Sequence, residues 1–195
     1  MRLFVAVELP AEVTAAVAQL IAQLRERCDR AWPRARISWA VPARMHLTLQ
    51  FVGEADLSRT EAIQRALLPP FGLTPFGIAL GGTGVFPDPH RPRVIWVGLT
   101  AGRAPLTDLQ QHVVARLARA GVQADDRPFR PHLTLGRVRE AAGLRTSSVL
   151  EGLAEAAVGR VPVDETVLFE SRATADGQVH VARQRTRLRD GKVEC

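Results

Sequence analysis

A thirteen-residue segment that occurs twice constrains the fold of this 195-residue chain more than any other feature. The segment PARMHLTLQFVGE at residues 42–54 aligns with PFRPHLTLGRVRE at residues 128–140, and eight of the thirteen positions are identical. The two copies lie 86 residues apart, which is too long for a solenoid unit. The repeat therefore predicts two similar lobes related by a pseudo-twofold axis, each contributing one HLTL strand to a shared cleft.

The segments that precede the two copies also correspond. A strand at residues 3–9 and a helix at residues 11–27 lead into the first copy, and a strand at residues 94–99 and a helix at residues 106–120 lead into the second. Short apolar runs predict the strands, and apolar spacings of three and four residues predict the helices. The two halves of the chain are therefore expected to share one order of elements.

The rest of the chain adds further elements of an α+β protein. Strands are predicted at residues 36–40, 45–52, 76–80, 132–138, 163–169 and 179–188, and helices from Ser58 to about residue 68 and over residues 147–157. The segment GGTG at residues 81–84 lacks the lysine and the spacing of a phosphate-binding loop, so a turn is expected there. We expect a single domain over residues 1–195, built from two duplicated lobes. Each lobe is an antiparallel sheet with helices on its outer face, and the lobes form a central cleft.

The HLTL motif of the first copy, residues 46–49, gathers reactive side chains on one face of a strand. Because alternate side chains of a strand share a face, His46 and Thr48 are expected to lie together with Arg44. The two leucines of the motif are then expected on the opposite face, toward the core. The polar face carries a base, a hydroxyl group and a cation.

The second motif, residues 132–135, repeats this arrangement with His132, Thr134 and Arg130. Two imidazoles near one phosphorus atom can act as a general base and a general acid. Threonine hydroxyl groups can donate hydrogen bonds to phosphate oxygens, and an arginine can neutralise charge in the transition state. The motifs carry neither carboxylates nor cysteines beside the histidines, so no metal is expected in this chemistry.

Composition restricts the class of protein and its compartment. Hydrophobic residues make up 46% of the chain and charged residues 24%, which is typical of a globular protein. The apolar runs are far shorter than a membrane span, the first residues do not form a secretory signal, and Cys28 and Cys195 lack a CxxC partner. We therefore expect a soluble, cytoplasmic protein without membrane association, a disulfide framework or a cysteine zinc site.

Arginine dominates the charged residues. The chain has 26 basic and 20 acidic residues, a formal net charge of +6, and Lys192 is its single lysine. A basic surplus is typical of a protein that binds a polyanion such as nucleic acid, and arginine binds phosphate oxygens two at a time. Arginine-rich, lysine-poor usage without tyrosine is equally well explained by a GC-rich genome, so charge alone does not identify a partner.

Several stretches along nearly the whole chain resemble one known family. These stretches are RLFVAVELP at residues 2–10, HLTLQFVGE at 46–54, GVFPDPHRPRVIWVG at 84–98, RPHLTLGRV at 130–138 and LFESRATADGQVH at 168–180. They resemble the 2H phosphoesterase superfamily, and most closely its RNA 2′,3′-cyclic phosphodiesterases, also called 2′-5′ RNA ligase-like proteins. His180 stands where that family usually has tyrosine, and we expect this difference to leave the active site unaffected.

The resemblance implies an activity and assigns roles to the motif residues. It implies hydrolysis of RNA 2′,3′-cyclic phosphate ends to a 2′-phosphate, with reversible 2′-5′ ligation as an associated activity and without a metal ion or cofactor. His46 and His132 are then the catalytic residues, with acid and base unassigned between them, and Thr48 and Thr134 bind the phosphate. The implied partners are RNA ends or nucleotides with a 2′,3′-cyclic phosphate, and we expect a monomer.

Two other functions remain open. One is a related phosphodiesterase that acts on small cyclic phosphates or on 2′-5′ oligonucleotides. The other is a non-catalytic RNA-binding module whose histidines only contact phosphate. Turnover of a 2′,3′-cyclic nucleotide separates the binding module from either enzyme, and a comparison of short RNA with a mononucleotide separates the two enzymes.

Two arginines compete for a second phosphate-binding role. The resemblance points to Arg137, five residues after His132, but alternation places its side chain on the opposite face unless a bulge at Gly136 turns it. Arg130 has the better position by alternation and the weaker support from the family. The equivalent of Arg137 in the first copy is Phe51, which alternation places on the leucine face, so core packing is favoured over stacking on a base.

Three further features receive simpler interpretations. His90, in a proline-rich loop, is expected at the surface, and His112 is expected to be partly exposed on a helix. The basic tail at residues 182–195 is interpreted as a charged, solvent-exposed strand edge, with contact to an RNA backbone as the alternative.

Overall fold

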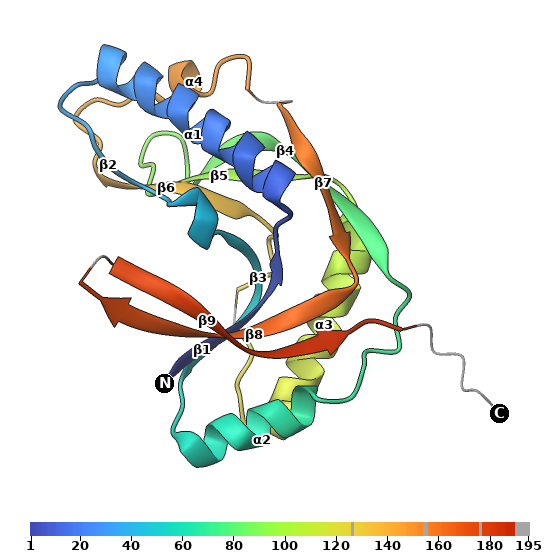
Figure 1. The fold of residues 1–195 in the computed structure, drawn as a ribbon. Coiled ribbons are helices and arrows are strands. Elements are labelled where there is room, and N and C mark those ends of the chain that lie inside the picture. The colour runs from blue at the N-terminus through green and yellow to red at the C-terminus, as the bar shows by residue number, and fades with distance from the viewer. Residues whose placement is uncertain (126, 154–155, 176, 190–195) are drawn as a thin grey trace.

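The computed structural model describes the chain except for residues 126, 154–155, 176 and 190–195. The described elements, in chain order, are β1 (Arg2–Glu8), α1 (Ala11–Ala31), β2 (Arg36–Trp39), the 3-10 turn η1 (Pro42–Arg44), β3 (His46–Glu54), α2 (Leu57–Leu67), β4 (Phe76–Phe86), β5 (Val94–Ala101), α3 (Arg103–Arg119), β6 (Leu133–Glu140), α4 (Thr146–Val149), β7 (Ala157–Val163), β8 (Glu165–Thr174) and β9 (Gly177–Arg187). The predicted α+β class is confirmed, and the strands form two antiparallel sheets (Figure 1).

The two sheets have corresponding strand orders. The first sheet has the order β3-β1-β8-β9 and the second has the order β2-β6-β5-β4-β7. Counted from the motif strands, β3, β1, β8 and β9 of the first sheet correspond to β6, β5, β4 and β7 of the second. β2 is an additional strand at the edge of the second sheet. This correspondence is the pseudo-twofold relation that the repeated segment predicts.

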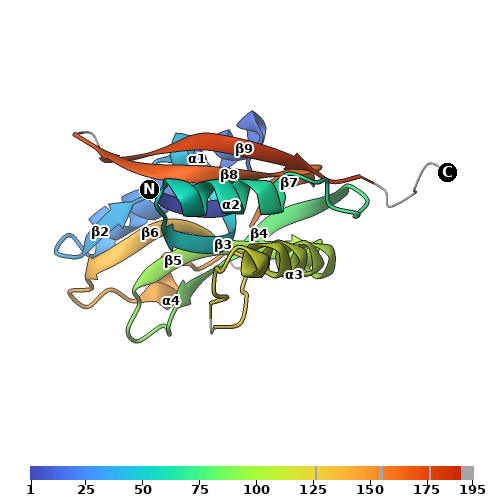
Figure 2. The same cartoon turned by 90° about the horizontal axis from the view of Figure 1, so that it is seen from below.

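Each long helix contacts the sheet that its preceding strand does not belong to. α1 follows β1 of the first sheet but contacts β6 and β7 of the second sheet. α3 follows β5 of the second sheet but contacts β3 of the first sheet and α2, in addition to β4. The two lobes therefore exchange their covering helices (Figures 1 and 2).

The apolar spacing of α1 explains its position. Val13, Val17, Leu20, Leu24 and Cys28 are buried and recur every three or four residues, which places them on one side of the helix. They belong to one hydrophobic cluster that also contains residues of both sheets. Burial of this side of the helix holds α1 against the second sheet.

The two shorter helices differ from the prediction. α2 begins after Asp56 and not at Ser58, because the Asp56 carboxylate accepts a hydrogen bond of 2.8 Å from the backbone N–H of Arg59. The helix predicted at residues 147–157 is reduced to the single turn of α4, and Gly152 follows with a φ of 72°, which a continued helix excludes.

The glycine-rich segment at residues 81–84 lies inside β4, so the predicted turn is wrong. β4 has a register shift beside Gly82, whose φ is 69°. At Gly84 the indole of Trp96 lies so close that a Cβ atom would overlap it. Glycine permits a bulge and close packing here. In the sequence alone, glycines that serve these purposes cannot be distinguished from glycines that form a turn.

The segment predicted as one strand at residues 163–169 contains a change of sheet. β7 ends at Val163 in the second sheet, and β8 begins at Glu165 in the first. Between them, the carbonyl of Asp164 accepts a hydrogen bond of 2.6 Å from the backbone N–H of Leu188, just after β9. The chain thus returns to the first sheet through a single residue.

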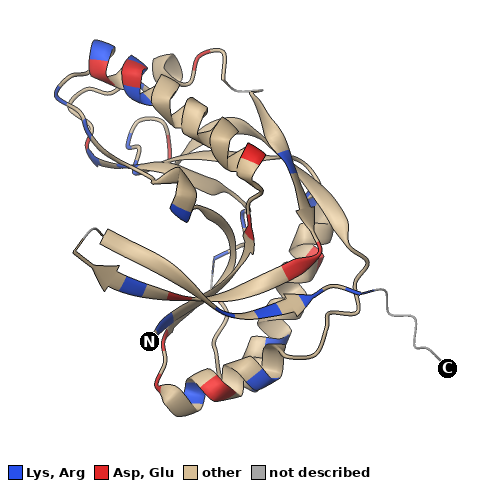
Figure 3. Cartoon of the chain, in the orientation of Figure 1, with Lys and Arg blue, Asp and Glu red and all other residues tan. Residues whose placement is uncertain are grey.

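Charged side chains of both signs are distributed over both lobes (Figure 3). Arg185 of β9, an edge strand, forms ion pairs with Glu8 of β1 and Glu165 of β8. The interpretation of the basic tail as a charged strand edge is confirmed up to the end of β9, and residues 190–195 lie outside the described residues. Of the helices described, none has both the length and the apolar character that a membrane crossing requires.

Candidate active site

The two motif strands lie next to each other although they belong to different sheets. β3 and β6 contact one another where the two sheets meet (Figure 1). The leucines of both HLTL motifs are buried, whereas the histidines and threonines are partly exposed. The predicted alternation is therefore confirmed within both motifs.

The two motif histidines make the same contact with the backbone. The Nδ1 atom of His46 lies 3.2 Å from the carbonyl oxygen of Arg44, and the Nδ1 atom of His132 lies 2.7 Å from the carbonyl oxygen of Arg130. Because a carbonyl oxygen only accepts hydrogen bonds, Nδ1 carries the proton that is donated. This tautomer leaves Nε2 of each ring as the nitrogen that can exchange a proton with a substrate.

Aromatic rings of the first sheet enclose His46. Phe4 of β1 stacks on it with ring centroids 4.4 Å apart and an interplanar angle of 26°, and His180 of β9 stands edge-on at 4.9 Å. The pKa of His46 is lowered to about 4, chiefly by burial and secondly by the charge of His180, against the hydrogen bond to the Arg44 carbonyl. His46 is therefore neutral at pH 7 and able to accept a proton.

His180 belongs to this cluster, so the prediction that it leaves the active site unaffected is wrong. Its ring stands edge-on to Phe4 at 5.0 Å as well as to His46. Its Nδ1 atom is buried and has no hydrogen-bond partner among the described residues. Burial, and secondly the guanidinium of Arg44, lowers the pKa of His180. A third imidazole thus contacts one of the two motif histidines.

His132 has different neighbours. Phe86, at the end of β4, stands edge-on to it at a centroid distance of 5.1 Å. Trp96 of β5 lies beside Phe86 at 5.0 Å. Equivalent positions of the repeat therefore have unequal surroundings, which permits the two histidines to take different roles.

A bulge in β3 turns Phe51 toward the polar face. Thr48 pairs with Ala6 of β1, and Phe51, three positions later, pairs with Phe4, only two positions away in the partner strand. The extra residue reverses the alternation of β3 after Thr48. Phe51 therefore shares a face with Thr48 and Phe4, and it is 57% exposed. The prediction that Phe51 packs in the core is wrong, because it assumed uninterrupted alternation.

β6 contains the equivalent bulge, as predicted at Gly136. Thr134 pairs with Trp96 of β5, and Arg137, three positions later, pairs with Val94, two positions away. The extra residue places Arg137 on the same face as Thr134, where its side chain is exposed. The predicted bulge is confirmed, and phosphate binding by Arg137 stays a prediction.

Alternation does not position the arginines that precede the two motifs. Arg130 lies before β6, which begins at Leu133, and Pro131 has no N–H to contribute to a strand ladder. In the first copy, Arg44 ends the turn η1, and its guanidinium donates a hydrogen bond of 3.1 Å to the carbonyl of Gln178 in β9. The prediction that these arginines share a strand face with the histidines is therefore wrong. Arg130 is exposed, and its carbonyl holds the second motif histidine.

The remaining histidines lie as predicted. His90 is exposed in the loop between β4 and β5, and His112 of α3 is about half exposed, with its Nε2 atom 3.7 Å from the carboxylate of Asp108. Within the described part of the chain, no three side chains of histidine, cysteine, aspartate or glutamate are grouped so that they could hold a metal ion.

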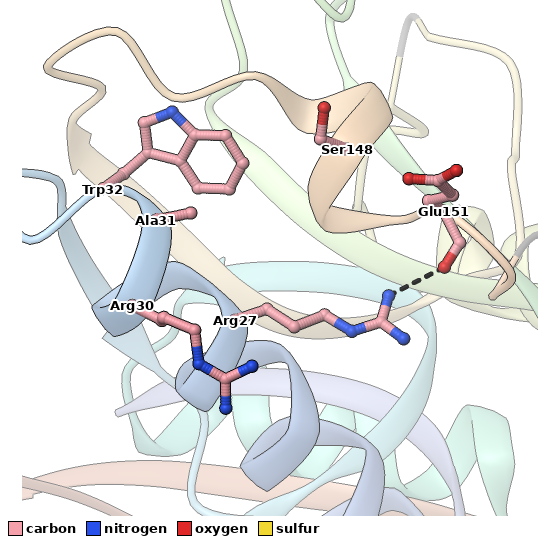
Figure 4. Close-up of a pocket in the computed structure, with 6 residues that line it drawn as sticks. All are labelled: Arg27, Arg30, Ala31, Trp32, Ser148 and Glu151. Carbon is pink, nitrogen blue, oxygen red and sulfur yellow. Dashed lines mark hydrogen bonds between the residues drawn. The ribbon is translucent and has the colours of Figure 1, made fainter.

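A surface pocket between α1 and α4 is separate from the motif residues (Figure 4). It is lined by Arg27, Arg30, Ala31, Trp32, Ser148 and Glu151. The guanidinium of Arg27 donates to the carbonyls of Glu151 at 2.7 Å and Val149 at 3.0 Å. Arg27 of α1 thereby contacts the end of α4 and the turn that follows it, and we interpret this pocket as a structural junction.

Comparison with known families agrees with this geometry. The family described as the 2′-5′ RNA ligase superfamily matches residues 13–175, a range that contains both HLTL motifs. The chain belongs to the 2′-5′ RNA ligase superfamily. The resemblance inferred from the motifs is thus confirmed, and in this superfamily the chain has relatives named RNA 2′,3′-cyclic phosphodiesterase.

These relatives match most of the chain. The protein of that name from Methanothermobacter thermautotrophicus is 34% identical over 158 residues, which cover 79% of this chain and 84% of the relative. The one from Thermus thermophilus is 34% identical over 206 residues, which cover 97% of this chain and 91% of the relative.

Solved structures of similar fold also cover nearly the whole chain. TT0787 of Thermus thermophilus has a TM-score of 0.72 at 27% identity, covering 99% of this chain and 100% of that one. E. coli LigT complexed with 3′-AMP has a TM-score of 0.72 at 25% identity, covering 96% and 97%.

Proposed function

We propose that this member of the 2′-5′ RNA ligase superfamily hydrolyses the 2′,3′-cyclic phosphate at an RNA end to a 2′-phosphate. The observation that carries the proposal is the shared backbone contact of the motif histidines, at 3.2 Å for His46 and 2.7 Å for His132. It leaves Nε2 of each ring able to exchange a proton with a substrate. The names of the relatives support the choice of RNA 2′,3′-cyclic phosphate as that substrate.

The proposed reaction uses one histidine on each side of the phosphorus. His46 is the base, because its lowered pKa of about 4 keeps it neutral at pH 7. Its Nε2 takes a proton from a water molecule, whose oxygen forms the new bond to phosphorus. The bond from phosphorus to the 3′ oxygen breaks, and His132 donates a proton to that oxygen. The products are a 2′-phosphate and a free 3′-hydroxyl group.

The other predicted site residues bind the phosphate in this proposal. Thr48 and Thr134 follow the histidines by two residues, and their hydroxyl groups donate to the non-bridging oxygens. Arg137 is favoured over Arg130 as the cation, because the bulge in β6 gives Arg137 the face of Thr134. A guanidinium there stabilises the negative charge that grows in the transition state.

The proposal includes the setting of the reaction. Both histidines come from one chain, so a monomer suffices for the reaction. The cytoplasm is the proposed location. If the 5′-hydroxyl group of another RNA takes the place of water, the same displacement forms a 2′-5′ phosphodiester bond and breaks the bond from phosphorus to the 3′ oxygen. The reverse of that step cleaves the 2′-5′ bond, so reversible 2′-5′ ligation accompanies the proposed hydrolysis.

Phosphorus NMR of the product from a short RNA with a 2′,3′-cyclic end tests the proposal. We expect the cyclic signal to be replaced by that of a 2′-monophosphate, and the His46→Ala and His132→Ala variants to leave it unchanged. A 3′-phosphate product would contradict the proposed geometry, and an unreacted substrate would favour a non-catalytic RNA-binding module. Faster turnover of a cyclic mononucleotide than of the RNA would favour a small cyclic phosphate as the substrate.

A further inference from the structure

Strand β2 extends the second sheet and has no counterpart in the first sheet (Figure 1). Ile37 and Trp39 of this strand are partly buried and pack against the hydrophobic core. Arg36 and Ser38 alternate with them and are exposed. Ser38 pairs with Arg137 of β6, and directly paired residues lie on the same face of a sheet. β2 therefore widens the face of β6 that carries Arg137.

A second bulge in β6 brings Arg139 to this face. Val138 and Glu140 pair with adjacent residues of β2, which leaves Arg139 as the extra residue between them. The Nε atom of Arg139 donates a hydrogen bond of 3.2 Å to the hydroxyl group of Ser38. Because a hydroxyl group is neutral, this contact positions the guanidinium without cancelling its charge.

The exposed cations of this face form an arginine row, which consists of Arg137, Arg139 and Arg36. The row begins at Arg137, which shares a face with Thr134 of the second motif, and continues along β6 away from His132. Arg36 at its far end is 80% exposed, and its Nε atom lies 3.5 Å from the carboxylate of Glu140. Three cations and one carboxylate leave the row with a surplus of positive charge.

This row fits the backbone of a single RNA strand. In an RNA that ends in a 2′,3′-cyclic phosphate, the strand leaves the terminal ribose through its 5′ oxygen, and each upstream nucleotide adds one phosphate. Arginine binds phosphate oxygens two at a time, and such contacts require no particular base. Protection of a sheet edge would place the charges on β2, whereas Arg137 and Arg139 belong to β6, an inner strand.

We propose that the arginine row binds the phosphates of the RNA strand upstream of the cyclic end, while the cyclic phosphate lies at His46 and His132. This inference rests on the proposed function and gives the enzyme a preference for an RNA end over a cyclic mononucleotide. In this arrangement β2 is the part of the second sheet that extends the site from one phosphate to several.

The test compares adenosine 2′,3′-cyclic phosphate with a tetraadenylate that has the same cyclic end. We expect the double variant Arg36→Ala/Arg139→Ala to lower kcat/KM for the tetranucleotide by about 10- to 100-fold, mostly through KM. Turnover of the mononucleotide should stay within about twofold, which also shows that the variant is folded. Arg25→Ala/Arg65→Ala is the matched control, because it removes two exposed arginines of α1 and α2, and it should leave both substrates within about twofold.

Binding of a tetraadenylate with a 2′-phosphate end gives a readout that needs no turnover. The slope of log affinity against log salt concentration should become less negative by about 0.7 for each arginine of the row that is removed. An unchanged slope would show that the strand lies elsewhere.

Three results with the substrates would overturn the inference. An equal loss on both substrates would show that the two arginines support the catalytic face and not the strand. No loss on the tetranucleotide, or the same loss in the control variant, would show that the row is not its binding surface. A wild-type protein that binds the tetranucleotide through the row but hydrolyses neither substrate would contradict the proposed function and retain the RNA-binding surface.

Discussion

The ring of His180 stands edge-on to the ring of His46, with centroids 4.9 Å apart and an interplanar angle of 88°. His180 comes from β9, far along the chain from the first motif, and Phe4 contacts both rings. Burial in this cluster and the charge of His180 lower the pKa of His46. The cluster therefore keeps the proposed base in its reactive, neutral form.

The dependence of kcat/KM on pH should show this effect. His46 must be neutral to accept a proton, and its pKa is lowered from 6.5 to about 4. Activity should therefore persist as the pH falls below 6.5 and decline only as the pH approaches about 4, tenfold per unit below it. Circular dichroism at each pH is the control for unfolding. An acidic limb near pH 6.5 would assign the base to another group.

Replacing His180 by phenylalanine should move that acidic limb to higher pH. The substitution keeps an aromatic edge against His46 and leaves the Arg44 guanidinium in place. It removes the His180 imidazole, whose positive charge disfavours protonation of His46 beside it. The measurement is again kcat/KM against pH, with His180→Tyr as a second uncharged variant. If neither variant moves the limb, burial alone sets the pKa of His46.

The motif histidines should be strongly non-additive. Each proton transfer typically contributes about 10²–10⁴-fold, so His46→Ala and His132→Ala should each lose at least that much in kcat, with little change in product affinity. The double variant should fall far short of the product of the two losses, because both groups serve one displacement. Full multiplication of the two effects would indicate independent roles.

Turnover should survive EDTA. The chemistry proposed for His46 and His132 needs only their imidazoles, so a chelator should leave kcat within about twofold. The rate is to be measured after extended dialysis against EDTA and after addition of zinc or manganese. Loss on chelation with recovery on metal addition would replace this mechanism by a metal-assisted one.

Arg137 and Arg130 should differ in their effect on activity. Arg137 lies on the face of Thr134 after the bulge, whereas Arg130 is exposed before the strand. Arg137→Ala should lower kcat/KM by about 10- to 100-fold, since charge-assisted contacts to phosphate are worth roughly 1.5–3 kcal/mol. Arg130→Ala is the matched control and should stay within about threefold. The reverse ranking would restore Arg130 as the phosphate ligand.

The repeated segment made the motif strands and their polar faces predictable, because two-residue alternation is a local property of a strand. The regular spacing of apolar residues likewise made α1 and α3 predictable. The position of Phe51 was not predictable in this way. The bulge that turns the Phe51 side chain depends on the pairing of β3 with β1, and the residues around Leu49 do not indicate an extra residue in the strand. At Gly136 the glycine of the second copy supplied that signal.

The other differences also arise from contacts between distant segments. His180 reaches His46 only because β9 joins the sheet of β3, a neighbourhood that the local sequence does not encode. Residues 81–84 form part of a strand in which the indole of Trp96 occupies the space that a side chain at Gly84 would take. Both features depend on tertiary packing, so they can be recognised only once the neighbouring strand is known.

The exchange of covering helices means that the duplication does not produce two separable units. A fragment holding only the first copy would present α1 with no sheet to cover, and its own sheet would lack both α3 and the strands β8 and β9. The segment between α2 and β4 is therefore not a linker between independent units, because a cut there would divide the hydrophobic core. We therefore expect the two halves to unfold as a single cooperative unit, and the interlocking to keep the two motif strands next to each other.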